Sequence, residues 1–422
     1  MTTTADSAKA PATASSDSTI GCACEKVIPR VDYASPELRQ RLTDHIRSHG
    51  VVVVENVFTD AECNAAMDEL ADSLHALSPA LTRKPKTWTR ENLPAGPRQG
   101  MYHSLVAQFP VVWDIRSDDR VHNVFQHAYS GLRGREITRF VTSCDGINVK
   151  PPTAPFHDPE KDWAHVDQTH DTDNIFKCIQ GQVVLTNTTA AFRCSPTSHH
   201  YLQELLDLDG GCRSAVSDFH LFREDGCRAI AAYVRATGGA YQTCVHARKG
   251  SMILWLSSLV HSAKGQDKHA PIDRSDPWSQ WRGVVYVCHR PREDVDEQHV
   301  NTLETAFASN RVTNHWGSKV FPKRNRRDRT TRTGLLAQLS ARPQDAFAIA
   351  NLRPQRTARV DALLRGGEWP VANGAVDDDD SDGGDDQEAL ADEDVSVNED
   401  GADGSAQQEH SDQDDDDARG NA

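Results

Sequence analysis

The feature that most constrains the fold of this chain is a series of short β-rich runs between residues 134 and 288. Turn residues separate the runs, and few long helical patterns lie between them. Many short strands without long intervening helices are typical of an antiparallel barrel or jelly roll. The runs cover residues 137–143, 164–167, 176–187, 241–247, 251–256 and 282–288. We therefore predict a mainly β fold with flanking helices, of the jelly-roll or cupin-like type.

Two helices are expected to interrupt the β region, at residues 200–208 and 218–236. A helix–strand–helix scaffold is expected before the β region. Ser35 and Pro36 fit the N-cap and the first turn of its first helix, and Gly50 fits its end.

The strand of this scaffold is predicted at the valine run of residues 51–54. Thr59 and Glu62 have the spacing of a capping box at the start of the second helix. Each helix carries an apolar stripe at helical spacing, which we expect to face the core. The stripes are Leu38, Leu42 and Ile46 in the first helix and Cys63, Met67, Leu70, Leu74 and Leu77 in the second.

The charge of the chain is very unevenly distributed. The 422 residues have a net charge of −16, yet residues 371–422 hold 20 acidic residues and one arginine. The tail alone therefore carries −19, and the residues before it carry +3. Polyacidic, low-complexity sequence cannot build a core. We predict a disordered N-terminus (1–26), a main domain (27–300), a basic, partly helical extension (301–370) and a disordered polyacidic tail (371–422).

The 10 cysteines are dispersed, and no CxxC pairs suggest a zinc ribbon. A long chain with dispersed cysteines and no secretory segment is expected to be intracellular, in the cytoplasm, with mostly reduced thiols. No apolar run approaches the roughly 20 residues of a membrane span, so we expect no membrane partner.

The first candidate for chemistry is the pair His165-x-Asp167 in the run at 164–167. On a strand, side chains at i and i+2 point to the same face, so these two project side by side. An imidazole and a carboxylate on one face supply two of the three ligands of a 2-His-1-carboxylate Fe(II) site. The spacing alone is a weak signal, because His410 and Asp412 repeat it in the acidic tail.

A second histidine stands at the far end of a strongly apolar run. Gly250 and Ser251 form a turn, and the run after it leads to His261, 94 residues beyond Asp167. In a jelly roll, strands far apart in sequence are neighbours, so His261 is a candidate third ligand. The alternative is a core histidine whose ring nitrogens are satisfied by the protein.

Arg282 opens the β-rich run at 282–288. Its guanidinium can hold a carboxylate by two parallel hydrogen bonds, as an oxygenase that uses 2-oxoglutarate requires. The alternative is an arginine in a surface ion pair. A zinc site formed by His165, Asp167 and His170 is the competing metal hypothesis, but it leaves Arg282 unexplained.

In their order and context, His165-x-Asp167, the run from Gly250 to His261, and Arg282 resemble the phytanoyl-CoA dioxygenase-like Fe(II)/2-oxoglutarate oxygenases. The resemblance covers roughly residues 27–325. Residues 50–59 are similar to the family's opening strand and following helix, and residues 192–199 are similar to its Pro-Gly-Ser-His turn.

Two departures from the family pattern matter. Thr197 stands where the turn usually has glycine. An insertion at residues 264–279 widens the gap between His261 and Arg282 to 21 residues, which leaves the role of Arg282 more open than that of the metal ligands.

The resemblance implies a double-stranded β-helix core with helices on its outer side. It implies that His165, Asp167 and His261 bind Fe(II), that Arg282 anchors the cosubstrate 2-oxoglutarate, and that O2 is the other cosubstrate.

Gln180 and Gln182 lie on one face of the strand at 176–187. By position they line the cosubstrate or substrate pocket, or else they are glutamines that face solvent. Asn148 and Lys150 are weaker candidates for the border of the same pocket.

The carboxylate at position 167 bears on the reaction. Related halogenases have a small residue there, which leaves room for chloride; Asp167 fills the position in this chain. The resemblance therefore implies hydroxylation of an unidentified small molecule or acyl conjugate, with 2-oxoglutarate and O2 converted to succinate and CO2.

The alternative function is a binding module that keeps the fold without the activity. Residues 311–332 contain eight basic residues and one acid, which suits a polyanion. Trp316 and Phe321 are the aromatic residues of that segment, too few for a base-stacking surface. We therefore expect a small-molecule substrate and no nucleic-acid partner.

Overall fold

The structure is a computed structural model, and the residues it describes all belong to one compact unit. They are residues 28–89, 92–93, 100–102, 105–153, 163–211, 218–320 and 352–370. The predicted N-terminal and acidic tails, and the basic segment from residue 321 onward, lie outside them. The predictions for those parts of the chain therefore stay predictions.

The described residues contain a large, mainly antiparallel sheet of seven strands, in which only β1 and β2 run parallel. The strands in sheet order are β1 (Arg30–Asp32), β2 (Val51–Glu55), β11 (Met252–Leu256), β7 (Ile179–Val184), β13 (Arg282–Val287), β5 (Ile147–Lys150) and β3 (Met101–Tyr102).

A smaller antiparallel sheet has five strands, and β4 (Phe140–Thr142) pairs separately with β14 (His289–Pro291). The strands of the smaller sheet in order are β10 (Thr243–Val245), β8 (Phe192–Cys194), β12 (His261–Ala263), β6 (His165–Val166) and β9 (His220–Leu221). Along the chain, β5 to β8 and β10 to β13 alternate between the large and the small sheet. The prediction of a sheet-rich fold with flanking helices is confirmed.

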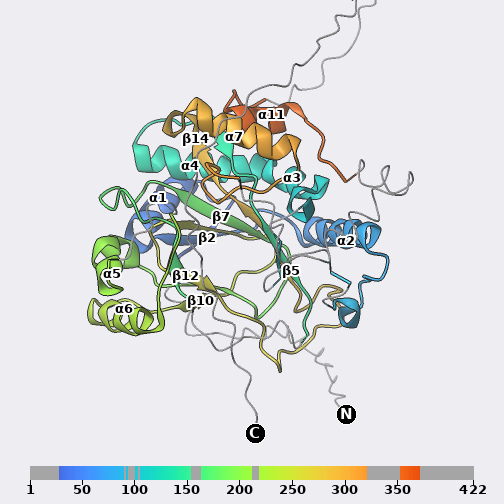
Figure 1. Cartoon of the computed structure of the whole chain (residues 1–422), viewed down its shortest axis with the longest axis horizontal. Helices are drawn as coiled ribbons and strands as arrows, with labels where there is room; N and C mark the ends of the chain where they lie inside the picture. The colour runs from blue at the N-terminus through green and yellow to red at the C-terminus, as the bar shows by residue number, and fades with distance from the viewer. Residues whose placement is uncertain are drawn as a thin grey trace, which may run out of the picture. The chain divides into compact units, whose positions relative to one another are not determined.

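Helices cover the outer sides of the sheets, with α4, α7 and α11 gathered on one side of the large sheet and α5 and α6 beside β10 and β12 (Figure 1). The α-helices are α1 (Leu38–His49), α2 (Asp60–Leu77), α3 (Pro110–Arg116), α4 (Asp119–Arg133), α5 (Leu202–Leu208), α6 (Glu224–Ala236), α7 (Glu297–Ala308) and α11 (Ala358–Arg365). Short 3-10 helices are η2 (Pro85–Thr87), η3 (Leu105–Gln108), η5 (Ser198–Tyr201) and η6 (Arg292–Asp294). Within the described ranges, none of these helices has the combined length and apolarity that crossing a membrane requires.

The two faces of the large sheet differ in chemistry. Its outer face is apolar: Val183 and Val285 are cross-strand partners and are fully buried. Helix α2 packs closely on this face, because a Cβ at Gly283 would lie 2.3 Å from the sulfur of Met67. The opposite, inner face carries buried polar side chains, among them Gln180 and Arg282. The hydrophobic effect therefore holds the helices on one face and leaves the other face to a site.

The helical part of the N-terminal scaffold matches the prediction closely. The apolar stripes of α1 and α2 are buried, and Thr59 and Glu62 form the capping box. Gly50 ends α1 in the left-handed region with φ +72°. The predicted start is wrong: α1 begins at Leu38 after Glu37, and the residues around Ser35 form a turn.

Each of the six predicted β runs contains a strand, but each strand is shorter than its run. The helix predicted at 218–236 begins only at Glu224, because His220 and Leu221 pair with β6 as the edge strand β9. Helices α3 and α4 and the strand β5 were not predicted.

Part of the predicted extension 301–370 packs on the main body. Leu303 of α7 and Val360 and Leu364 of α11 share a hydrophobic cluster with Trp113 and Val141. The boundary expected at residue 300 falls inside α7. The division into domains remains a prediction, although the described C-terminal helices contribute to a common core.

The turn after β8 contains a conformation that suits glycine. Thr197 has φ +72°, and its backbone N–H donates to the carbonyl of His49 at 3.0 Å. A β-branched residue in this region is strained, and non-glycine residues there cost roughly 1–3 kcal/mol. This is the position at which the chain departs from the family's glycine.

Buried histidines should make the stability of the protein depend on pH. Burial lowers the pKa of His122, which stacks on Trp369, to about 4. Between about pH 4 and 6.5 the unfolded chain therefore binds a proton here that the folded chain does not. We expect the free energy of unfolding to fall as pH drops through this window. His122→Phe should make the fall shallower in urea titrations at several pH values, and an unchanged slope would contradict the assignment.

The strained turn gives a second prediction. Thr197→Gly should raise the free energy of unfolding by about 1 kcal/mol, since relief of the left-handed strain exceeds the entropy cost of glycine. Gly50→Ala is the opposed control, because its Cβ would lie 2.6 Å from Nδ1 of His199 at φ +72°. Urea unfolding should move in opposite directions for the two variants. A Thr197→Gly protein that unfolds at lower urea would show that the threonine is not strained.

Candidate metal centre

The structure brings His165, Asp167 and His261 together in one buried cluster. His165 on β6 and His261 on β12 are cross-strand partners, so their rings share a face and lie 4.2 Å apart. Asp167 follows two residues after His165 and returns to that face. One ligand atom from each residue lies within 4.8 Å of the other two. In the part of the chain that the structure describes, this is the one such cluster of metal-binding side chains.

Backbone contacts orient the ligand atoms. Nδ1 of His165 lies 3.2 Å from the carbonyl of Trp163, and Nδ1 of His261 lies 2.9 Å from the carbonyl of Leu259. A carbonyl only accepts, so each Nδ1 carries the proton and a neutral ring leaves its Nε2 with a lone pair. This is the arrangement of a metal-binding histidine whose other nitrogen is held by the protein.

The electrostatics favour the ligand forms of these side chains. Burial lowers the pKa of His165 to about 3, with the neighbouring His261 acting in the same direction. Burial alone would raise the pKa of Asp167, but His261, His315 and His165 outweigh it and hold that pKa well below its usual range. A neutral imidazole and an ionised carboxylate are the forms that bind a metal ion.

A row of polar side chains on the inner face of the large sheet leads away from this cluster. Gln180 donates to Asp167 Oδ2 at 3.0 Å. Gln182 stands opposite Tyr286, and Arg282 stands opposite Lys150. Since side chains alternate along a strand, Gln180 and Gln182, like Arg282 and Tyr286, share one face. The predicted metal ligands and the predicted pocket residues thus lie on the inner side of the sheets.

Three of these side chains have buried atoms without a protein partner. They are the Oε1 atoms of Gln180 and Gln182 and the Nε of Arg282, and each side chain is at most 2% exposed. The two glutamines do not face solvent, and Arg282 is not in a surface ion pair; its Nη1 donates to the carbonyl of Ala190 at 2.8 Å. Buried polar atoms without partners are costly and are rare in native proteins. They fit a polar ligand that binds on this face.

A small cavity lies between the inner faces of the two sheets. Gln182 and Arg282 line it from the large sheet, and Phe192 and Val245 line it from the small sheet. The ring of Phe192 also lies 5.6 Å from the ring of His261, so the cavity adjoins the metal-binding cluster. The cavity therefore lies next to the candidate metal ligands, with Arg282 on its wall.

Three residues that contact Asp167 or its partners carry no signal in the sequence that predicts them as site residues. Nδ1 of His315 lies 2.5 Å from Asp145 Oδ2, and Nε2 of His315 lies 3.9 Å from Asp167 Oδ2. Trp316 Nε1 donates to the backbone carbonyl of Asp167 at 2.8 Å. Burial alone would lower the pKa of His315, but Asp145 and Asp167 raise it to about 10. No local motif marks His315, because 148 residues separate it from Asp167.

The other histidines near the motif do not join the cluster. His170 is exposed, so the competing zinc site of His165, Asp167 and His170 is not formed in the described structure. His199 is buried, and its Nε2 lies 3.1 Å from the carbonyl of Arg47. His157 lies outside the described residues.

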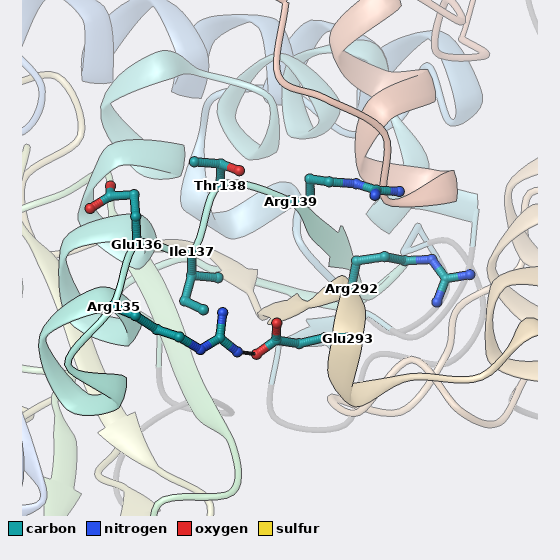
Figure 2. Close-up of a pocket in the computed structure, with 7 residues that line it drawn as sticks. All are labelled: Arg135, Glu136, Ile137, Thr138, Arg139, Arg292 and Glu293. Carbon is teal, nitrogen blue, oxygen red and sulfur yellow. Dashed lines mark hydrogen bonds and ion pairs between the residues drawn. The ribbon is translucent and has the colours of Figure 1, made fainter.

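A second cavity lies on the surface between the loop after α4 and η6 (Figure 2). Figure 2 shows Arg135 and Glu293 in an ion pair across it. Arg139 donates through Nε to the carbonyl of Gly366, and Arg292 donates through Nη1 to the carbonyl of Val295. None of the predicted site residues lines this cavity, and its arginines are engaged by the protein itself.

Comparisons with known proteins give distant similarities. No family model matches the chain. The Ava biosynthesis cluster protein O of Aspergillus versicolor is 23% identical over 296 residues, which are 66% of this chain and 86% of that protein.

The chain is also similar to three solved structures, each with a TM-score below 0.5. The epimerase SnoN in complex with Fe3+, alpha ketoglutarate and nogalamycin RO is 14% identical, with 61% of this chain and 85% of SnoN covered and a TM-score of 0.37. The GlcNAc-inducible protein GIG2 of Candida albicans is 13% identical, with 80% and 83% covered and a TM-score of 0.41. A hypothetical protein from Escherichia coli is 13% identical, with 67% and 76% covered and a TM-score of 0.45. These similarities are too distant to assign the chain to the phytanoyl-CoA dioxygenase-like family or to any other.

Proposed function

We propose that this chain is an Fe(II)- and 2-oxoglutarate-dependent dioxygenase that hydroxylates a small molecule or an acyl conjugate. The observation that carries the proposal is the buried cluster of His165, Asp167 and His261, which supplies the two imidazoles and one carboxylate of a facial Fe(II) site. The partnerless Nε donor of Arg282 supports a second, anionic ligand.

The strand order supports a double-stranded β-helix as the core of this enzyme. Strands β5 to β8 and β10 to β13 alternate between the two sheets, which gives the orders β11-β7-β13-β5 and β10-β8-β12-β6. Such alternation wraps the chain twice around one interior, as in a jelly roll. The metal-binding cluster and the polar row then face each other across that interior.

Bound at such a site, Fe(II) with 2-oxoglutarate and O2 supplies the oxidising power for hydroxylation of a substrate C–H bond, with release of succinate and CO2. The residues of this chain bind and orient the reactants. Arg282, opposite Lys150, offers guanidinium hydrogen bonds to the distal carboxylate of 2-oxoglutarate. Gln182 and Asn148 lie along the same face between that end and the cluster.

Aromatic side chains keep water from the cluster. The rings of Phe192 and Trp255 each lie 5.6 Å from the ring of His261, and both side chains are almost completely buried. A dry surrounding strengthens the interactions of the charged ligands, because the local dielectric constant is low.

The proposal predicts that activity needs all three metal ligands. Purified protein with Fe(II), 2-oxoglutarate and O2 should form succinate when offered a panel of small metabolites, in amounts that depend on the substrate. His261→Ala should reduce succinate formation below about one hundredth of the wild-type rate, since loss of an inner ligand costs more than the 10–100-fold of an outer contact. Iron content is measured in parallel, with His170→Ala as the control at an exposed histidine. A His261→Ala enzyme that keeps iron and turnover would remove His261 from the site.

The role of Arg282 has its own test. Arg282→Lys should raise the apparent KM for 2-oxoglutarate by about 10–100-fold, because an ammonium cannot reproduce the two parallel hydrogen bonds of a guanidinium. The iron content should stay at the wild-type level, which separates this effect from damage to the metal site. An unchanged KM would place the 2-oxoglutarate anchor at another residue.

A further inference from the structure

Asp145 and His315 lie beside Asp167, and neither belongs to the metal-binding motif. Asp145 is 2% exposed and lies in the turn between β4 and β5. Its Oδ1 accepts from the backbone N–H of Gly146 at 2.6 Å, while its Oδ2 lies 2.5 Å from Nδ1 of His315. The opposite nitrogen of that ring, Nε2, lies 3.9 Å from Asp167 Oδ2. One imidazole therefore lies between two buried carboxylates, hydrogen-bonded to Asp145 and at ion-pair distance from Asp167.

The turn that carries Asp145 is itself fixed. Arg116 of α3 is fully buried, and its Nη2 donates to the carbonyl of Asp145 at 2.5 Å. The same guanidinium donates through Nη1 to the carbonyl of Ala107 at 3.2 Å. Asp145 can thus hold the His315 ring in one orientation, because its own backbone is held from behind.

The segment that carries His315 is held against Asp167 by other contacts. Thr313 and Val320 form a β-bridge, and the N–H of Thr313 donates to the carbonyl of Cys144 at 2.9 Å. Trp316, the next residue after His315, donates to the backbone carbonyl of Asp167 at 2.8 Å. The segment therefore approaches both the backbone carbonyl and the side-chain carboxylate of Asp167.

We propose that Asp145 and His315 form a dyad that positions the carboxylate of Asp167 for metal binding. The inference rests on the proposed metal site, and it assigns His315 as a positioning residue, because it acts through Asp167. A carboxylate ligand has two oxygens and rotates about its side-chain bonds unless its second oxygen is held. Gln180 holds Oδ2 from the large sheet, and the dyad approaches the same oxygen from the segment after α7.

The dyad has a measurable consequence. Replacing a residue that orients a metal ligand typically lowers the metal affinity by about 10–100-fold. His315→Ala should therefore lower the affinity for Co(II), a spectroscopic stand-in for Fe(II), by about 10–100-fold. His315→Gln should restore part of the loss, because its amide N–H reaches toward Asp167 from nearly the same place as the imidazole. Asp145→Asn should cause a smaller loss, since it leaves the bridging ring without its charged partner.

The test is a titration of the full-length, metal-free protein with Co(II), followed by the visible d–d absorption and by the dissociation constant. Neither readout depends on substrate or turnover. His165→Ala reports the loss of the site itself, and His122→Phe is a matched control, a buried histidine that packs on Trp369 and contacts none of the ligands. Thermal unfolding of each metal-free variant separates loss of affinity from loss of fold.

The double variant Asp145→Asn/His315→Ala sharpens the test. If the two residues act as one unit, the double variant should lose no more affinity than His315→Ala alone. Additive losses would show that Asp145 does not act through His315 and would overturn the dyad. If His315→Ala does not fold, the Gln and Asn variants test the same assignment.

The outcomes separate the two proposals. Wild-type affinity in folded His315→Ala protein, or in Asp145→Asn protein where His315→Ala does not fold, with binding lost in His165→Ala, would overturn the dyad and leave the metal site standing. Failure of the wild-type protein to bind Co(II) through His165 would overturn the proposed metal site, and the dyad with it.

Discussion

The arrangement of the interior depends on one strand pairing, that of β6 with β12, in which His165 stands opposite His261. A shift of one residue would send one of the two rings to the other face of the sheet and separate them. Contacts outside the pair fix the register: Ser257 accepts from the N–H of Asp167, and Cys194 on β8 is the other cross-strand partner of His261. The site is therefore a property of the sheet, in which a short motif supplies two of the three side chains.

The two faces of the large sheet contribute differently to the stability of the fold. On β7 and β13 the outer face consists of valine, isoleucine and glycine, and it stabilises the fold by burial of apolar surface. The inner face buries Gln180, Gln182 and Arg282 with atoms left unpaired, at about 1–3 kcal/mol for each such group. Apolar residues at these positions would give a more stable pair of sheets without these polar groups. We therefore attribute the outer face to folding, and the polar inner face to the proposed binding site.

The sequence predicted what depends on local periodicity. The i, i+2 spacing placed His165 and Asp167 on one face, and the apolar stripes of α1 and α2 are buried as their 3.6-residue period requires. It did not predict what depends on distant contacts. The strand β9 lies within a segment of helical pattern and forms because β6 offers an edge. His315 has no local signal, because its contacts with Asp145 and Asp167 arise only from folding of a remote segment.

The segment that carries His315 and Trp316 connects residues beyond position 300 to the candidate metal site. A protein ending at residue 300 would contain every predicted ligand, together with Arg282 and both glutamines. It would lack the indole of Trp316, which holds the backbone of Asp167, and the imidazole of His315, which faces its carboxylate. It would also lose Leu303 and Val360 from the hydrophobic cluster that backs β4. The candidate ligands belong to the sheets, but Trp316 and His315, which contact Asp167, lie beyond them, so we expect the functional unit to extend at least through residue 320.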